Sequence, residues 1–227
     1  MTASAPEPLH TADATSDTGH DADAATSGAG RKRPKPGERR VQILQALAAM
    51  LEQPGAERIT TAALAARLDV SEAALYRHFA SKAQMFEGLI EFIEQSIFGL
   101  VGQLGDREPD AAARSRKLVT LLLQFGEKNP GMTRVMVGDA LVFENERLQQ
   151  RMNLFFDKIE ATLRQNLREA AVLSGTATPT VDAQADASVV TAFCVGRLQR
   201  FARSGFKRLP SESLEHSLAL LLPTEHL

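Results

Sequence analysis

The stretch "VSEAALYRHFASK", residues 70–82, carries the densest set of local structural signals in this chain. Ser71 can cap the N-terminus of a helix that begins at the next residue. Val70 and Leu75 lie on either side of that cap at the spacing of a hydrophobic staple, which sets the direction in which the chain enters the helix. The stretch therefore predicts a short helix that carries a Tyr-Arg-His run, followed closely by a second helix start.

Helices are also predicted on both sides of this stretch. A first helix should begin near Glu38 and end at "EQPGAE", with an apolar stripe formed by Val41, Leu44, Leu47, Ala48 and Leu51. Thr60 or Thr61 can cap a second helix, and the second and third helices should each have about eight residues. Ser81 and Gln84 have the spacing of a capping box, which predicts the start of a long fourth helix.

The rest of the chain has helical periodicity almost throughout. Apolar stripes run through residues 111–128, 132–142, 145–170, 183–204 and 211–222, and the segments "NPG" (129–131) and "LSGTATPT" (173–180) interrupt them. No stretch shows the sustained two-residue alternation of a half-buried strand. The sequence therefore predicts an all-α protein.

The second and third predicted helices, joined by "LDVS", have the arrangement of a helix-turn-helix motif. Leu64, Leu68, Leu75 and Phe79 can pack against the first helix, which leaves the opposite side of the third helix facing outward. In such a motif the second helix enters the major groove of DNA with its N-terminal end first. The candidate DNA contacts are Thr60, Thr61, Ser71, Glu72, Ala73, Ala74, Tyr76, Arg77, His78 and Lys82.

These candidates differ in what they can contact. Ala73 and Ala74 are small enough to allow a close approach to base edges, and Arg77 can reach a guanine or a phosphate. Tyr76 and His78 suit the DNA backbone, and Lys82, near the N-terminus of the fourth helix, suits a phosphate. The alternative is a three-helix cap whose polar surface has no binding role.

The net charge of −2 conceals an uneven distribution of charge along the chain. Residues 1–30 contain five acids and no Lys or Arg, residues 31–82 contain ten basic and five acidic residues, and residues 83–227 contain sixteen basic and eighteen acidic residues. A basic segment of this kind is typical of local nucleic-acid binding, although a solvated basic face would have the same composition. Residues 1–37 have almost no large apolar side chains, so we expect an unstructured acidic tail and basic arm there.

The segment "ITTAALAARLDVSEAALYRHFASKAQMFEGLI", residues 59–90, closely resembles the DNA-binding end of TetR-family regulators. Asp69 stands where Gly is common in that family, and Ala80 stands where Pro is common; Asp tolerates left-handed backbone geometry, so the turn should survive. The resemblance implies a helix-turn-helix module at 38–82 and a helical body at 83–227. It also implies a homodimer that binds a palindromic site in double-stranded DNA. Its helices at about 183–204 and 211–222 would pair with those of the partner, and Gly196 would allow a close helix approach.

The body resembles a narrower group of that family, the nucleoid occlusion factors. The resemblance rests on "LIEFIEQSI", "LLLQFGEKNPGMTRVMVGDALVFENERLQQRMN" and "FDKIEATLRQNLRE". It implies a cytoplasmic, nucleoid-associated inhibitor of cell division that binds chromosomal DNA and disrupts polymers of the division protein FtsZ. The FtsZ contact would be made by Phe92, Leu121, Lys128, Asn129 and Met132. The alternative interpretation is that Phe92 and Leu121 are simply core residues with no role in partner binding.

Other functions have little support in the sequence. The five His residues are scattered and suggest no metal site, no Gly-rich loop follows a strand, and we expect neither an enzyme nor a bound cofactor. No apolar run reaches the roughly 18 residues that a membrane span requires. Cys194 lies in the apolar run "VVTAFCV" and is expected to be a core residue. Acids such as Glu144 are expected to be solvated or paired with Arg rather than catalytic. The main alternative function is that of a transcriptional repressor released by a small ligand.

Overall fold

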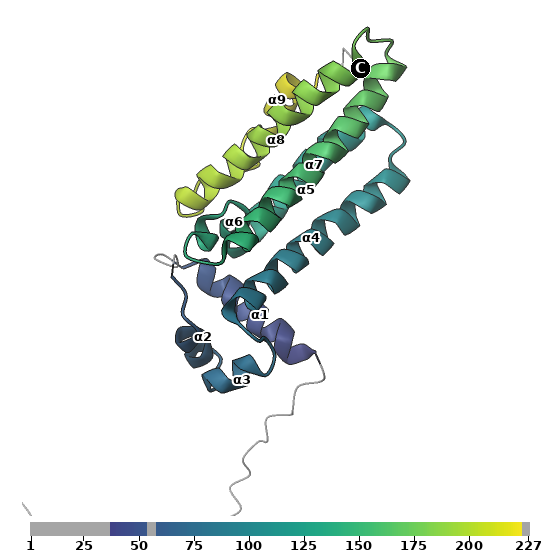
Figure 1. The fold of residues 1–227 in the computed structure, drawn as a ribbon. Coiled ribbons are helices and arrows are strands. Elements are labelled where there is room, and N and C mark those ends of the chain that lie inside the picture. Colours follow the sequence, from purple (N-terminus) through teal and green to yellow (C-terminus); the bar gives the residue numbers. More distant parts are fainter. Residues whose placement is uncertain (1–36, 54–57, 224–227) are drawn as a thin grey trace, which may run out of the picture. The chain divides into compact units, whose positions relative to one another are not determined.

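Within the residues that the computed structural model describes, 37–53 and 58–223, every regular element is a helix (Figure 1). This confirms the all-α prediction, whereas the expected tail and most of the basic arm lie outside the described residues. The helices are α1 (Glu38–Leu51), α2 (Thr61–Arg67), α3 (Glu72–Tyr76), α4 (Lys82–Arg107), α5 (Ala111–Lys128), α6 (Pro130–Met136), the 3-10 helix η1 (Asp139–Leu141), α7 (Glu146–Leu173), α8 (Pro179–Arg203) and α9 (Leu214–Leu221).

The helix caps predicted around α2 and α3 are present. Thr60, rather than Thr61, caps α2 by accepting a hydrogen bond from the amide of Ala63 at 3.2 Å. Ser71 caps α3 by accepting one from the amide of Ala74 at 3.3 Å. The two helices are shorter than expected, with seven and five residues. Asp69 takes the left-handed conformation in the turn between them, with φ of 54°, as its short side chain permits.

The stripe predicted on α1 was partly wrong. Val41 is 53% exposed, and Ile43, which was not assigned to the stripe, is buried. The reason is that α1 packs on more than one side: it contacts α2, α4 and α6. Leu47 and Leu51 are buried as predicted, and Leu64, Leu75 and Phe79 complete the small core of the first three helices.

The start of α4 differs slightly from a complete capping box. Ser81 accepts a hydrogen bond from the amide of Gln84 at 3.2 Å, as predicted. The Gln84 side chain, however, accepts from the amide of Ala80 at 2.9 Å rather than from that of Ser81. Pro at position 80 would lack this N–H, so Ala80 permits a bond that the common Pro would remove.

The body is built on α4, α5, α7 and α8, which Figure 1 shows as long, roughly aligned helices. Their inward faces supply large side chains that are almost completely buried, among them Leu89, Ile93, Leu122, Phe155 and Leu198. Arg151 on α7 holds α4 in place through a bidentate pair with Glu94, with N–O distances of 3.2 and 2.5 Å. The Glu94 carboxylate raises the pKa of Arg151 by bonding to its charged form.

The segment predicted as one helix over 132–142 is two short ones. α6 begins at Pro130, where a missing N–H costs nothing, and it ends before Gly138, whose φ of 84° places it in the left-handed region. Gly131 lies so close to α1 that an added Cβ would meet the carbonyl oxygen of Ala48 at 2.0 Å. A glycine at this position therefore lets α6 join the first three helices to the body.

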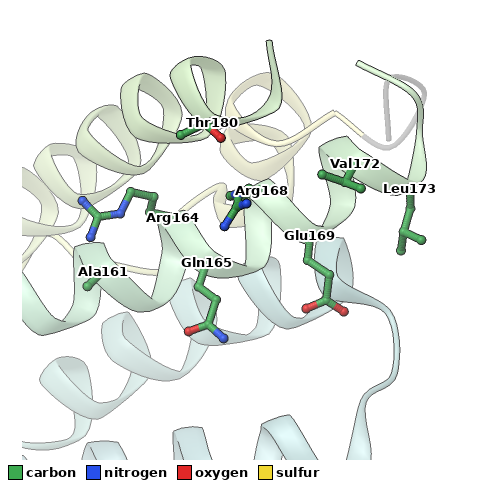
Figure 2. A pocket seen from close by; sticks show the side chains of 8 residues that line it. All are labelled: Ala161, Arg164, Gln165, Arg168, Glu169, Val172, Leu173 and Thr180. Carbon is green, nitrogen blue, oxygen red and sulfur yellow. The ribbon is translucent and has the colours of Figure 1, made fainter. Parts of the chain in front are cut away.

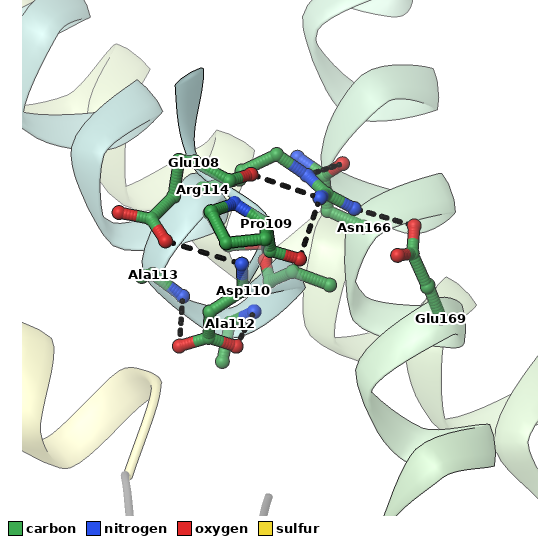
Figure 3. Close-up of polar contacts among 10 residues, drawn as sticks. Glu108, Pro109, Asp110, Ala112, Ala113, Arg114, Asn166 and Glu169 are labelled. Atoms are coloured by element: carbon green, nitrogen blue, oxygen red, sulfur yellow. Dashed lines mark hydrogen bonds and ion pairs between the residues drawn. The ribbon is translucent and has the colours of Figure 1, made fainter. Parts of the chain in front are cut away.

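Arg114 makes several bonds around the connection between α4 and α5 (Figure 3). Arg114 donates to the carbonyl oxygens of Glu108 and Pro109, each at 3.1 Å, to the side chain of Asn166 at 3.2 Å, and it pairs with Glu169. The last two residues belong to α7. Arg114 therefore ties the turn between α4 and α5 to the C-terminal half of α7.

Candidate functional site

Most of the residues predicted to contact DNA, which lie on α3 and around it, are exposed to solvent. Thr60, Ser71, Glu72, Ala73, Tyr76, Arg77 and His78 are exposed, and Thr61, Ala74 and Lys82 are half-buried. On the other side of α3, Leu75 is buried against the first three helices. The predicted set is therefore accessible, with its apolar neighbour turned inward.

Arg40 holds the C-terminal end of α3 in place, a role that the sequence did not predict. Its guanidinium lies 4.1 Å from the centre of the Phe79 ring and donates to the carbonyl oxygen of His78 at 3.0 Å. His78 lies two residues beyond the end of α3, so this bond fixes the chain that leads from α3 toward α4. The contact spans 38 residues of sequence, so no local pattern indicates it.

Thr61 and Glu72, both predicted to contact DNA, contact each other. The Thr61 hydroxyl donates to Glu72 Oε2 at 2.5 Å and joins the first turn of α2 to the first turn of α3. This bond fixes the direction of the one acidic side chain at the start of α3. The carboxylate is exposed, so it remains available to a binding partner.

Lys82 has a partner within the chain. Its ammonium group pairs with the carboxylate of Glu144, which lies between η1 and α7. Next to Glu144, Phe143 lies with its ring centre 5.7 Å from the guanidinium of Arg58. The expectation that Glu144 is solvated or paired with Arg was therefore wrong: its side chain is 9% exposed and paired with Lys82.

The five residues assigned to a protein partner occupy different environments. Phe92 on α4 is 48% exposed and Lys128 is exposed, whereas Leu121, Asn129 and Met132 are half-buried. Phe92 is therefore not a core residue. The Asn129 side chain donates to the carbonyl oxygen of Phe125 at 2.7 Å and so satisfies one of the last carbonyls of α5.

A surface pocket of about 290 Å³ lies between the C-terminal half of α4 and the N-terminal half of α5. Apolar side chains share its wall with charged ones, and its lining residues are Leu100, Gln103, Leu104, Arg107, Glu108, Lys117 and Leu121. Lys117 and Glu108 form an ion pair, which lowers the pKa of Glu108. Leu121 belongs both to this pocket and to the predicted partner surface.

One stripe along the outer face of α8 consists mostly of small and apolar residues. Val181, Val189 and Ala192 are exposed on it, and a Cβ added to the half-buried Gly196 would meet nothing within 4 Å. Val172 on the neighbouring α7 is exposed as well. The prediction that residues 211–222 form a second long helix was wrong, because α9 has only eight residues. The long helices in this part of the body are α7 and α8.

A second pocket, of about 730 Å³, lies at the C-terminal end of α7 beside Thr180 of α8 (Figure 2). Arg164, Gln165 and Arg168 line it from α7. All of its lining residues are exposed except Ala161, which is half-buried, so it is an open groove rather than an enclosed ligand cavity.

Cys194 is buried, and burial raises the pKa of its thiol to about 12, so the thiol is protonated at neutral pH. Among the described residues, no three His, Cys, Asp or Glu side chains are grouped as a metal site. No helix in the described part of the chain combines the length and apolarity needed to cross a membrane.

Two family models match the chain. Residues 43–89 match "Bacterial regulatory proteins, tetR family", and residues 110–224 match "Tetracyclin repressor-like, C-terminal domain". The first match contains α2 and α3 with their caps, and the second contains the long helices of the body after α4. These models describe DNA-binding regulators and no catalytic family.

Solved structures share the fold at low identity. The fatty acid degradation regulator FadR from Bacillus halodurans has a TM-score of 0.68 at 14% identity, with 86% of this chain and 100% of that chain covered. The regulator AibR, solved with isovaleryl coenzyme A and operator DNA, has a TM-score of 0.64 at 16% identity, with 82% and 98% covered. These likenesses confirm the TetR-like fold.

Curated relatives are much more similar in sequence. The nucleoid occlusion factor SlmA of Vibrio cholerae serotype O1 is 53% identical over 184 residues, with 81% of this chain and 93% of the relative covered. The protein of the same name from Escherichia coli O9:H4 is 53% identical over 178 residues, with 78% and 89% covered. The chain therefore belongs to the TetR family of bacterial DNA-binding regulators and, within that family, to the nucleoid occlusion factor SlmA proteins.

Proposed function

We propose that this protein is a nucleoid occlusion factor that acts in the cytoplasm on chromosomal DNA. As a homodimer it binds palindromic DNA sites through α2 and α3, and on DNA it binds FtsZ and disrupts FtsZ polymers. The observation that carries this proposal is the 53% identity to relatives of that name over about four fifths of the chain. Inhibition of division is thus restricted to the region around the nucleoid.

The exposed recognition helix supports the DNA-binding part of the proposal. A helix must approach the bases closely to read them, and the small side chains of α3 permit that approach in the DNA major groove. Arg77, which follows them, can then reach a base or a phosphate. The exposed basic side chains Arg58, Arg67 and Arg77 lie in the same module and supply attraction to phosphates.

The surface of α4 and α5 supports the FtsZ part. An extended peptide needs an apolar slot for its anchoring side chains and polar groups for its backbone and acidic residues. Phe92 and Leu121 offer apolar surface, and Lys128 offers a cation at the end of α5. The pocket that shares Leu121 extends this surface toward Arg107 and Lys117.

The outer face of α7 and α8 supports the homodimer. Val172, Val181 and Val189 are exposed there, and a second copy would cover them in a four-helix bundle. The pairing helices are then α7 and α8 rather than α8 and α9, and the groove of Figure 2 adjoins this face. The open space above Gly196 is where a partner helix approaches most closely.

The test is a polymerisation assay with purified FtsZ and GTP, followed by light scattering. The full chain with a DNA site selected from genomic fragments should lower the polymer signal, and the full chain without DNA should do so less. A regulator released by a small ligand would leave FtsZ polymers intact under both conditions. Its bound genomic fragments would also cluster beside one neighbouring gene, whereas an occlusion factor would select many dispersed sites.

A further inference from the structure

The start of the recognition helix carries a negative charge, which is unusual for a surface that faces DNA. Glu72 is the first residue of α3 and is exposed. Phosphate groups repel a carboxylate, so Glu72 does not contribute to binding through the DNA backbone. It can form an attractive contact only with hydrogen-bond donors on base edges in the groove.

The major groove offers few such donors. Guanine presents two acceptors and thymine presents one acceptor and a methyl group, so both disfavour a carboxylate. Adenine presents an amino donor beside its N7 acceptor, a pair that matches an amide side chain. Cytosine presents its N4 amino group alone, and a carboxylate is the side chain that accepts from it.

The neighbouring residues position Glu72 for this contact. The Thr61 hydroxyl donates to Glu72 Oε2 at 2.5 Å, which orients the side chain and leaves Oε1 to accept from a base. The hydroxyl of Thr60 accepts from the amide of Ala63 and so caps α2, whereas the hydroxyl of Thr61 bonds to Glu72. Ala73 and Ala74 follow Glu72 and add no bulk that would hold α3 away from the bases.

We infer that Glu72 determines sequence specificity by accepting a hydrogen bond from the N4 amino group of one cytosine in each half-site, with Thr61 as its positioning residue. The inference rests on the proposed entry of α3 into the major groove. It adds the chemical identity of a base and the residue that reads it.

The experiment selects bound duplexes from a random double-stranded DNA library, with the full-length protein and variants of it, and compares the base preferences by sequencing. Wild type should enrich cytosine at one position of each half-site. Glu72→Ala should lose that preference, which corresponds to about 5- to 150-fold discrimination for a specific side chain–base contact. Glu72→Gln should change it to adenine, because an amide matches the N6 and N7 pair.

Further variants separate positioning and charge from base reading. Thr61→Val should weaken the cytosine preference, and Thr61→Ser, which keeps the hydroxyl, should restore it. Glu52→Gln removes the same charge from an exposed residue at the far end of α1 and should leave every base preference unchanged.

Two outcomes would overturn the inference, and they differ in what else they imply. If Glu72→Ala and Glu72→Gln select the same site as wild type, Glu72 contributes only charge, and the proposed DNA binding stands. If wild type enriches no sequence at all, the groove assignment of α3 fails together with the inference.

Discussion

Lys82, at the first residue of α4, forms an ion pair with Glu144, which lies 62 residues later in the chain. The Lys82 side chain is 28% exposed and that of Glu144 is 9% exposed. The pair joins the end of the DNA-binding module to the segment before α7. A DNA phosphate that binds Lys82 would therefore compete with Glu144 for the same ammonium group.

We expect Lys82→Ala to weaken DNA binding at all sequences and to reduce the salt dependence by about one phosphate contact, a slope change of about 0.9. Glu144→Gln should do the opposite and tighten binding at low salt, because the ammonium group loses its internal competitor. Fluorescence anisotropy at several salt concentrations measures both effects. Glu146→Gln, which removes a nearby exposed charge, is the matched control. An unchanged salt slope in Lys82→Ala would rule out the phosphate contact.

Arg77 is the exposed C-cap residue of α3 and is a further charged candidate for a DNA contact. If it reads a guanine, Arg77→Ala should lose about 1–3 kcal/mol of binding free energy on the selected site and little on unrelated DNA. Anisotropy on both duplexes measures the difference, and circular dichroism checks that the helix content is unchanged. An equal loss on both duplexes would assign Arg77 to a phosphate instead.

The features predicted correctly from the sequence are those set by neighbouring residues. The caps formed by Thr60, Ser71 and Ser81 depend on a hydroxyl and an amide three residues apart, and each is present. The left-handed backbone of Asp69 is local in the same sense. Such signals are sufficient to recognise a helix-turn-helix module.

The features that were missed depend on contacts distant in sequence. Arg40 bonds to His78 and Lys82 pairs with Glu144, and no local pattern indicates either partner. The environment of Val41 was misassigned because a periodic stripe specifies one buried face, whereas α1 packs against three helices. The length of α9 was overestimated because the apolar stripe over residues 211–222 continues beyond the eight residues that form the helix.

Gly196 provides a test of the dimer interface. Gly196→Leu should be tolerated by the single chain, because a Cβ there meets nothing within 4 Å, but the larger side chain would block a partner helix. We expect a monomer in analytical ultracentrifugation and a loss of affinity for the palindromic site. Gly102→Leu on α4 is the matched control, since the space around it is equally open. A Gly196→Leu protein that remains dimeric would place the interface elsewhere.

Because Cys194 is buried, we expect the free energy of unfolding to fall as the pH rises above about 9. Its thiol has a pKa raised from 9.0 to about 12 by burial, so the folded chain keeps a proton that the unfolded chain releases above about pH 9. Between these values the contribution of Cys194 to stability should fall by about 1.4 kcal/mol per pH unit. Denaturant unfolding of wild type and Cys194→Ala from pH 8 to 10 measures it. The free energies of unfolding of the two proteins should converge as pH rises, and parallel curves would contradict the prediction.

The last prediction concerns the FtsZ surface, where the structure changes which variants are informative. Asn129→Ala would remove the bond to the Phe125 carbonyl and disturb the end of α5, so Asn129 is better left intact. Lys128→Glu should instead cost the fold only about 0.3–1 kcal/mol through the helix dipole, because Lys128 is exposed in the last turn of α5. Phe92→Ser removes a side chain that is already 48% exposed.

We expect each of these two variants to lose at least about tenfold in FtsZ affinity, which is about 1.4 kcal/mol, while dimerisation and DNA affinity remain as in wild type. Light scattering of FtsZ polymers in the presence of the selected DNA site measures the functional loss, and anisotropy measures DNA binding. Lys207→Glu, the same charge reversal at an exposed position after the end of α8, should behave as wild type. If Lys128→Glu and Phe92→Ser both disassemble FtsZ polymers as well as wild type does, FtsZ does not bind to this surface of α4 and α5.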